Sequence, residues 1–196
     1  MNFLAHIYLS GQHEKVMLGN FIGDFVKGKE IDKLNAPFKL GVSLHRAIDQ
    51  FTDEHSVVLE SKKRVRSVCG HYAPVVVDMY YDHFLAANWS RFSSTELKSF
   101  TSTFYDITDK YWSELPQKCQ HMLVYMKRDD WLYQYQFIEG IDKAFNGMSR
   151  RANFESNMEK AAHLLTAHYG AFEDEFNTFF PDLVLMCKQY LMDKNA

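Results

Sequence analysis

Acidic and imidazole side chains interrupt the most apolar stretches in the front half of the chain. The first is Asp24, which lies inside the run FIGDFV at residues 21–26. An isolated carboxylate is costly to bury among such side chains. Either Asp24 points to water, or a cation neutralises it.

A second group consists of His45, Asp49 and Asp53, each four residues after the one before. On a helix, residues four apart return to nearly the same face, so two of these side chains can meet one ion or one hydrogen-bonded network. A carboxylate can also orient the imidazole of a metal-bound histidine. An exposed pair on a solvated helix face is the structural alternative.

A third group lies in the aromatic and aliphatic stretch VDMYYDHFL at residues 77–85. Asp78 and Asp82 are one helical turn apart, and His83 adjoins Asp82. Adjacent helical residues point about 100° apart, so Asp82 and His83 reach one site only if it lies between them. His6, which follows an apolar triplet, is either a further ligand or a core histidine satisfied by a hydrogen bond.

These residue types indicate divalent-cation chemistry. Oxygen and imidazole ligands suit Mn²⁺, Mg²⁺ or Fe²⁺ better than a structural zinc site. Such an ion can activate water for attack on phosphorus and stabilise the leaving oxygen. The three cysteines at positions 69, 119 and 187 form no C-x-x-C pair, so we expect reduced, buried thiols. The sequence contains no GxxxxGK[ST], G-x-S-x-G, H-E-x-x-H or complete dinucleotide-binding motif.

Helical periodicity accounts for most of the chain. Apolar residues recur at intervals of three and four, whereas sustained alternation is scarce. The prolines at 37, 74, 116 and 181 each lie where a helix can begin, because the first turn tolerates proline. Ser93 and Glu96 match a capping box. The predicted helical segments are 37–52, 74–86, a helix after the box at 93–96, a helix opened by Pro116, 133–147, 154–168 and 171–192.

We therefore predict an all-α protein with seven to nine helices in one compact domain spanning residues 1–196. Neither a repeat nor a long linker divides the chain. Gly19 and Gly23, four apart, would form a smooth strip on a helix and allow a neighbour to approach closely.

Charge and hydropathy narrow the function classes. The net charge of −3 argues against a dedicated nucleic-acid binder. We expect no membrane segment, because no run approaches the roughly 18 apolar residues that span a bilayer. A signal peptide is not expected either, which favours the cytoplasm. Lys62, Lys63, Arg64 and Arg66 form a basic cluster whose structural alternative is a solvated helix face.

Four motifs together resemble the bacterial acyl carrier protein phosphodiesterases. They are MNFLAH at residues 1–6, GNFIGDFVKG at 19–28, HRAIDQFTD at 45–53 and DHFL at 82–85. The resemblance covers the whole chain and is strongest over about residues 1–92. That family is similar to the all-helical histidine-aspartate (HD) metal phosphohydrolases, which implies an HD-domain-like helical fold.

The resemblance implies an enzyme of fatty acid and lipid metabolism that hydrolyses holo acyl carrier protein to 4′-phosphopantetheine and the apo carrier. It implies Mn²⁺ or a similar cation and an essential role for Asp24. His45, Asp49, Asp82 and His83 would bind the metal. The doublet Asp82-His83 reverses the His-Asp order that names the HD superfamily, which leaves individual ligands open.

The acidic carrier would be attracted to a basic docking surface. Arg46 or Lys27 would contact the phosphodiester. The other available cations are Lys29, Lys33, Lys39 and the basic cluster at 62–66.

Two other functions stay open from the residues alone. One is a metal phosphohydrolase acting on nucleotides or another small phosphodiester. The other is a non-catalytic helical binding module, whose acids and histidines would be structural. The oligomeric state has no signal in the sequence.

Overall fold

The computed structural model describes residues 1–195, and every regular element within that range is helical. The all-α prediction is confirmed. The α-helices are α1 (Phe3–Tyr8), α2 (Glu14–Phe21), α3 (Ala36–Glu54), α4 (Ser56–Cys69), α5 (Ala73–Ala87), α6 (Leu97–Lys110), α7 (Gln117–Arg128), α8 (Trp131–Gln134), α9 (Ile138–Ser149), α10 (Ala161–Ala167) and α11 (Tyr169–Asn195). The 3-10 helices are η1 (Gly23–Phe25), η2 (Gly28–Lys33), η3 (Gly70–Tyr72), η4 (Trp89–Arg91), η5 (Trp112–Glu114) and η6 (Met158–Lys160). The predicted seven to nine helices are too few. The predicted segments omit α1, α2, α4 and α8, of which α1 and α8 contain too few residues to show a period.

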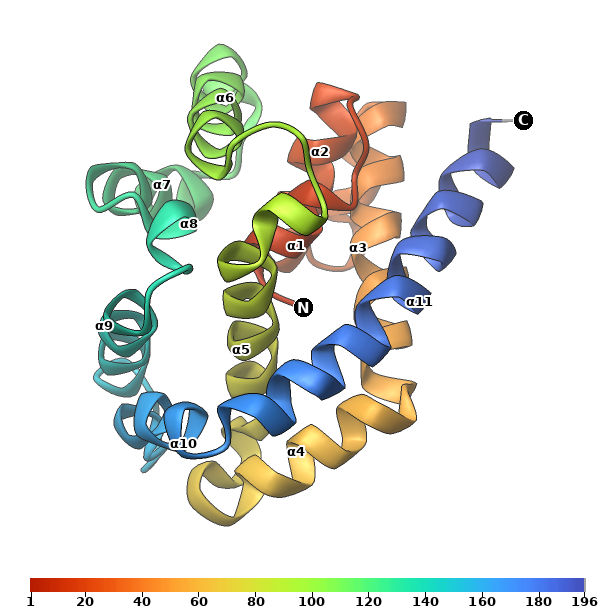
Figure 1. Cartoon of the computed structure of the whole chain (residues 1–196). Helices are drawn as coiled ribbons and strands as arrows, with labels where there is room; N and C mark the ends of the chain where they lie inside the picture. Colours follow the sequence, from red (N-terminus) through yellow and green to blue (C-terminus); the bar gives the residue numbers. More distant parts are fainter. Residues whose placement is uncertain (196) are drawn as a thin grey trace.

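Helix α5 runs through the centre of the molecule and packs against α1, α4, α9 and α11 (Figure 1). Its residues are buried around nearly the whole circumference. A helix that is apolar on every side is stable only when neighbours cover every side. The polar residues Asp82 and His83 of α5 are therefore buried as well.

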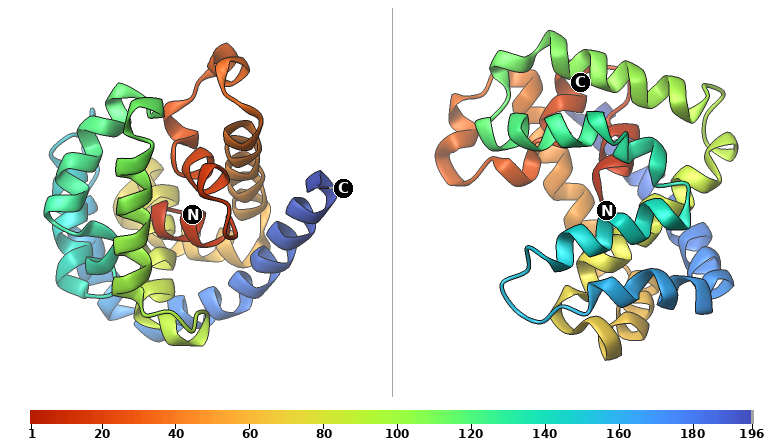
Figure 2. Two further views of the ribbon diagram at one scale, coloured as in Figure 1. Left: turned by 90° about the horizontal axis from the view of Figure 1, so that it is seen from above. Right: turned by 90° about the vertical axis from the view of Figure 1, so that its left-hand side faces the viewer.

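Helices α2 and α3 pack with their backbones in close contact. A Cβ atom at Gly19 would overlap the carbonyl oxygen of Phe38, and one at Gly41 would overlap that of Val16. The predicted close approach at Gly19 is confirmed. Gly23, however, lies beyond the end of α2, in η1. Figure 2, seen from above, shows α1, α2 and α3 gathered around the N-terminus.

Proline marks three helix starts correctly and one wrongly. Pro116 directly precedes α7 as its N-cap. Helix α3 begins where Asn35 accepts a hydrogen bond from the backbone N–H of Phe38, with Pro37 in the first turn. Pro74 lies in the first turn of α5. The prediction fails at Pro181, which lies inside α11. The buried face of α11 continues past this proline, so packing against the core outweighs the missing hydrogen bond.

Two further local predictions are wrong. Helix α6 begins at Leu97 without a side-chain cap, and the Ser93 hydroxyl instead accepts from the backbone N–H of Thr95 at 3.1 Å. The helix predicted from Phe154 begins later, since residues 150–157 form a turn, a bend and irregular backbone, and α10 starts at Ala161. Both errors come from local patterns that the path of the chain overrides.

The buried apolar side chains form one cluster that extends from α1 to α11, and most of the aromatic rings lie in this cluster or pack against it. The three cysteines are free and buried, as expected. Among the helices of residues 1–195, none combines the length and the apolar composition needed to cross a lipid bilayer.

Candidate metal centre

Two buried imidazoles lie face to face between α1 and α3. The rings of His6 and His45 have centroids 4.1 Å apart and an angle of 20° between their planes. Asp49, one turn after His45, places Oδ1 3.2 Å from Nε2 of His6 and Oδ2 3.1 Å from Nε2 of His45. One carboxylate therefore joins both rings, and the predicted shared face of His45 and Asp49 is confirmed.

Asn20, on α2, holds the opposite edge of both rings. Its side-chain Oδ1 lies 2.7 Å from Nδ1 of His6, and its backbone oxygen lies 2.8 Å from Nδ1 of His45. Each Nδ1 donates its proton to an oxygen of Asn20. In the neutral form, each ring therefore presents an unprotonated Nε2 to the carboxylate of Asp49.

Asp24 approaches the same place from the solvent side. It lies in η1 with Oδ1 3.4 Å from Nε2 of His45, and 70% of its side chain is exposed. Gly23 makes this approach possible, because a Cβ atom there would overlap the His45 ring. Nε2 of His45 is buried and forms no well-oriented hydrogen bond within the described residues, although two carboxylates lie within 3.4 Å.

The carboxylates and imidazoles shift one another's pKa values. Burial lowers the pKa of His45, but the facing carboxylates of Asp24 and Asp49 outweigh burial and raise this pKa to about 9. Partial burial alone would raise the pKa of Asp49, yet its contacts with the two imidazoles hold the pKa well below its usual range. The pKa of Asp24 is lowered by its contact with His45. Burial lowers the pKa of His6. Both carboxylates are therefore ionised at neutral pH.

The geometry and the ligand types fit a divalent cation. The ligand atoms of His6, His45 and Asp49 lie within 4.8 Å of one another. Nε2 of His6 also lies 3.1 Å from the carbonyl oxygen of Met1, so the Nε2 atoms of both rings face only acceptors. Acceptors that converge without a donor repel one another unless a proton or a metal ion lies between them. Nitrogen and carboxylate oxygen ligands suit Mn²⁺, Mg²⁺ or Fe²⁺.

The α-ammonium group of Met1 borders this cluster. It lies 3.0 Å from Oδ1 of Asp78, on α5, and 3.9 Å from Oδ1 of Asp49. Opposite charges at these separations attract each other strongly when they are shielded from water. This contact ties the start of the chain to α5 and places a third carboxylate, that of Asp78, beside the carboxylates of Asp24 and Asp49.

Asp82, a predicted ligand, lies away from these nitrogen atoms. It accepts hydrogen bonds from the backbone N–H groups of Leu4 at 2.7 Å, Ala5 at 3.2 Å and Asn2 at 3.3 Å. These are donors at the N-terminus of α1 that have no partner within the helix. Burial raises the pKa of Asp82 to about 7. Asp82 thus anchors the helix that carries His6, and it reaches the cluster only through that helix.

His83 and Arg46 also lie outside the cluster. His83 donates from Nδ1 to the carbonyl oxygen of Tyr135 at 2.8 Å, and its Nε2 lies 3.0 Å from the hydroxyl of Tyr169. Both ring nitrogens are therefore occupied. Arg46 is exposed on α3 and has no ion pair within residues 1–195.

Of the six predicted ligands, the structure brings together His6, Asp24, His45 and Asp49. The sequence interpretation missed Asn20, although it lies inside the motif at 19–28. An amide that orients two rings from a neighbouring helix leaves no spacing pattern in the sequence.

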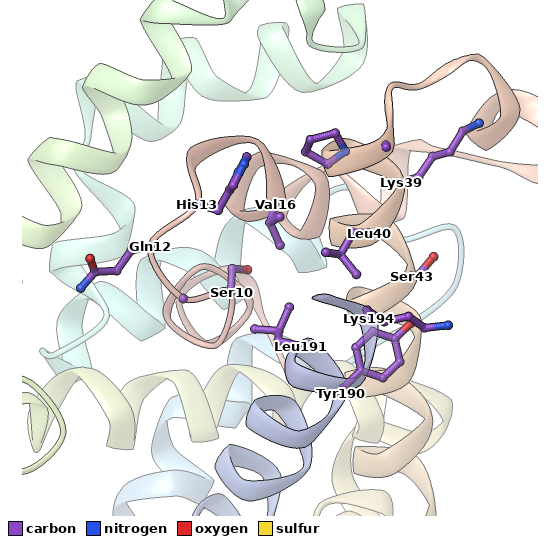
Figure 3. Close-up of a pocket in the computed structure, with 13 residues that line it drawn as sticks. Ser10, Gln12, His13, Val16, Lys39, Leu40, Ser43, Tyr190, Leu191 and Lys194 are labelled. Atoms are coloured by element: carbon purple, nitrogen blue, oxygen red, sulfur yellow. The ribbon is translucent and has the colours of Figure 1, made fainter. Parts of the chain in front are cut away.

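A larger cavity lies elsewhere, between the turn after α1, the first half of α3 and the end of α11 (Figure 3). It has a volume of about 620 Å³ and apolar walls that include Val16, Leu40 and Leu191. His6, Asp24, His45 and Asp49 do not line it. The candidate centre is instead a charged site that opens at the exposed side chain of Asp24.

Comparison with known proteins gives a consistent assignment. A family model described as acyl carrier protein phosphodiesterase matches residues 1–183. An acyl carrier protein phosphodiesterase of Photorhabdus laumondii is 29% identical over 195 residues, which is 99% of this chain and 94% of the relative. One from an O6:H1 strain of Escherichia coli is 31% identical over 185 residues, which is 94% of this chain and 96% of the relative. No solved structure gave a significant match. The chain belongs to the acyl carrier protein phosphodiesterase family.

Proposed function

We propose that this protein hydrolyses the phosphodiester of holo acyl carrier protein, releasing 4′-phosphopantetheine and the apo carrier, at a divalent-cation site. His6, His45 and Asp49 would hold the cation, with Asp24 at the open side. The observation that carries the proposal is the convergence of the Nε2 atoms of His6 and His45 and a shared carboxylate in the buried part of one site. Membership of a phosphodiesterase family supports the same activity.

The expected ion is Mn²⁺, with Mg²⁺ or Fe²⁺ as alternatives. A bound divalent cation lowers the pKa of water and stabilises negative charge on phosphoryl oxygens. Two imidazoles and one carboxylate occupy only part of its coordination sphere, which leaves positions for water and for the substrate.

The residues of the chain orient the reacting groups. The ionised, exposed carboxylate of Asp24 can accept a hydrogen bond from the attacking water and take up its proton. Water adds to phosphorus, and the bond between phosphorus and the carrier's hydroxyl oxygen breaks. The proton that water loses balances the proton that this oxygen gains.

The structure changes which cations are the best candidates for carrier docking. Lys62 pairs with Asp53, Lys63 with Glu60, and Arg64 with Glu175. Their charges are therefore largely neutralised by these neighbours.

Lys27, Lys29 and Lys33 are better placed, because they are exposed in the segment that follows Asp24 and have no ion pair in the described part of the chain. Reversing these three to Glu should raise the KM for holo carrier and reduce its salt dependence. Lys62→Glu with Lys63→Glu serves as the matched control. An equal rise in KM for both variants would contradict this docking surface.

Incubating the pure protein with holo carrier and Mn²⁺, followed by mass measurement of the carrier, tests the main proposal. We expect the carrier to lose the mass of phosphopantetheine, and a chelator or Asp24→Ala to prevent the loss. A carrier that keeps its full mass would exclude this substrate. Hydrolysis of a nucleotide phosphodiester in the same preparation would then favour a small-molecule phosphohydrolase.

A further inference from the structure

The buried amide of Asn20 has only one orientation that satisfies its neighbours. Its Nδ2 lies 2.8 Å from the carbonyl oxygen of His6 and 2.9 Å from Oγ of Ser10. A carbonyl oxygen can only accept, so the atom that faces it must be the amide nitrogen. Oδ1 consequently faces Nδ1 of His6, and only a protonated Nδ1 can donate to it.

Asn20 also sets the position of the proton on the second ring, that of His45, but through a different atom. The backbone oxygen of Asn20, which also can only accept, lies 2.8 Å from Nδ1 of His45. That nitrogen is therefore protonated as well. Two histidines from α1 and α3 thus depend on one residue of α2 for the placement of their protons.

We infer that Asn20 is the positioning residue of the metal centre, because it fixes both imidazoles in the tautomer whose Nε2 can bind a cation. Metal-bound histidines generally need such a partner on the other ring nitrogen, and its loss weakens metal binding. The role in cation binding rests on the proposed function, whereas the tautomer of His6 can be measured without any metal. Close packing at Gly19, the preceding residue, holds α2 against α3 at this point.

Ser10 supplies a matched control. Its hydroxyl donates to the carbonyl oxygen of His6 at 2.7 Å and accepts from Nδ2 of Asn20 at 2.9 Å, and Ser10 also borders the cavity in Figure 3. Ser10→Ala removes this outer partner but keeps the bond from His6 to Oδ1 of Asn20. It therefore reports the structural cost of disturbing the network without freeing either ring.

The first measurement is the ¹⁵N chemical shifts and couplings of His6 in metal-free wild-type protein. A neutral ring protonated at Nδ1 is expected. A neutral ring protonated at Nε2 would overturn the inference, and this result needs no variant.

The second measurement is the Kd for Mn²⁺ and the melting temperature of three variants. Asn20→Leu, similar in size, should raise the Kd about 10- to 100-fold. Asn20→Asp should bind Mn²⁺ far more tightly than Asn20→Leu. One oxygen of a protonated carboxyl group can accept from Nδ1 of His6 while the other donates to the His6 carbonyl. Ser10→Ala should stay within about threefold of wild type, whatever its melting temperature.

Wild-type affinity in Asn20→Leu, or an equal loss in Ser10→Ala, would show that Asn20 is merely structural. If Asn20→Leu does not fold, the Kd of Asn20→Asp and the wild-type ¹⁵N spectrum of His6 decide whether Asn20 positions the rings. Wild-type protein that binds no divalent ion would refute the proposed function, and the spectrum would still decide the role of Asn20.

Discussion

Binding of a cation to this site should release one proton, and that proton should come from His45. The carboxylates of Asp24 and Asp49 raise the pKa of His45 to about 9, so at pH 7 the metal-free ring is about 99% protonated. His6 is neutral at that pH, because burial lowers its pKa. Both carboxylates are already ionised. A single proton therefore competes with the metal ion.

The strength of the competition between the proton and the metal ion follows from the difference between the pH and the pKa of His45. At pH 7 the apparent Kd for Mn²⁺ should be about 100-fold weaker than at a pH above 9, and it should change about tenfold per pH unit between these limits. Isothermal titration calorimetry in two buffers with different ionisation enthalpies measures the proton count directly. We expect about one proton released per ion at pH 7.

Two variants make this test specific. Asp24→Asn removes one carboxylate that raises the pKa of His45, so proton release at pH 8 should decrease. Asp53→Asn alters the same helix, but Asp53 pairs with Lys62, so the count should not change. Release of no proton would show that the carboxylates do not hold His45 protonated. Release of two would show that His6 is charged, and either result would refute the reasoning.

Three further results are expected. In metal-free protein, the raised pKa of His45 adds at most about 3 kcal/mol of stability, which is fully present below pH 6.5 and is lost as pH rises through 9. The melting temperature of the metal-free protein should therefore fall across that pH window. Saturating Mn²⁺ should abolish the fall, and a fall that persists with Mn²⁺ would contradict the ion pairing of His45. Gly23→Ala should weaken Mn²⁺ binding at least about tenfold, because the new methyl group would overlap the His45 ring. In Gly147→Ala, on α9, the new methyl group has no atom within 4 Å, so this control should leave binding unchanged in the same titration. Asp82→Asn should lower the free energy of unfolding by about 2 kcal/mol in denaturant titration, because it weakens three hydrogen bonds at the start of α1, two of them buried. An unchanged unfolding midpoint would exclude this anchoring role.

The sequence was informative wherever a single helix carries the pattern. The step from His45 to Asp49 placed both side chains on one face, because four residues complete about one turn. Asn35 and Pro37 marked the start of α3 for an equally local reason. The all-α fold followed from periodicity that extends over most of the chain. These features depend on neighbours within a few residues, which the sequence lists in order.

Only the tertiary structure decided which faces of different helices meet. Asp82 and His83 are adjacent in the sequence, yet the first binds the N-terminus of α1 and the second binds Tyr135 and Tyr169. Their directions differ because successive helical side chains point to different sides of the buried helix α5. Asn20 could not be recognised for a related reason. Its role depends on how α2 packs between the helices that carry the two imidazoles, and that packing is set by contacts among residues far apart in the chain.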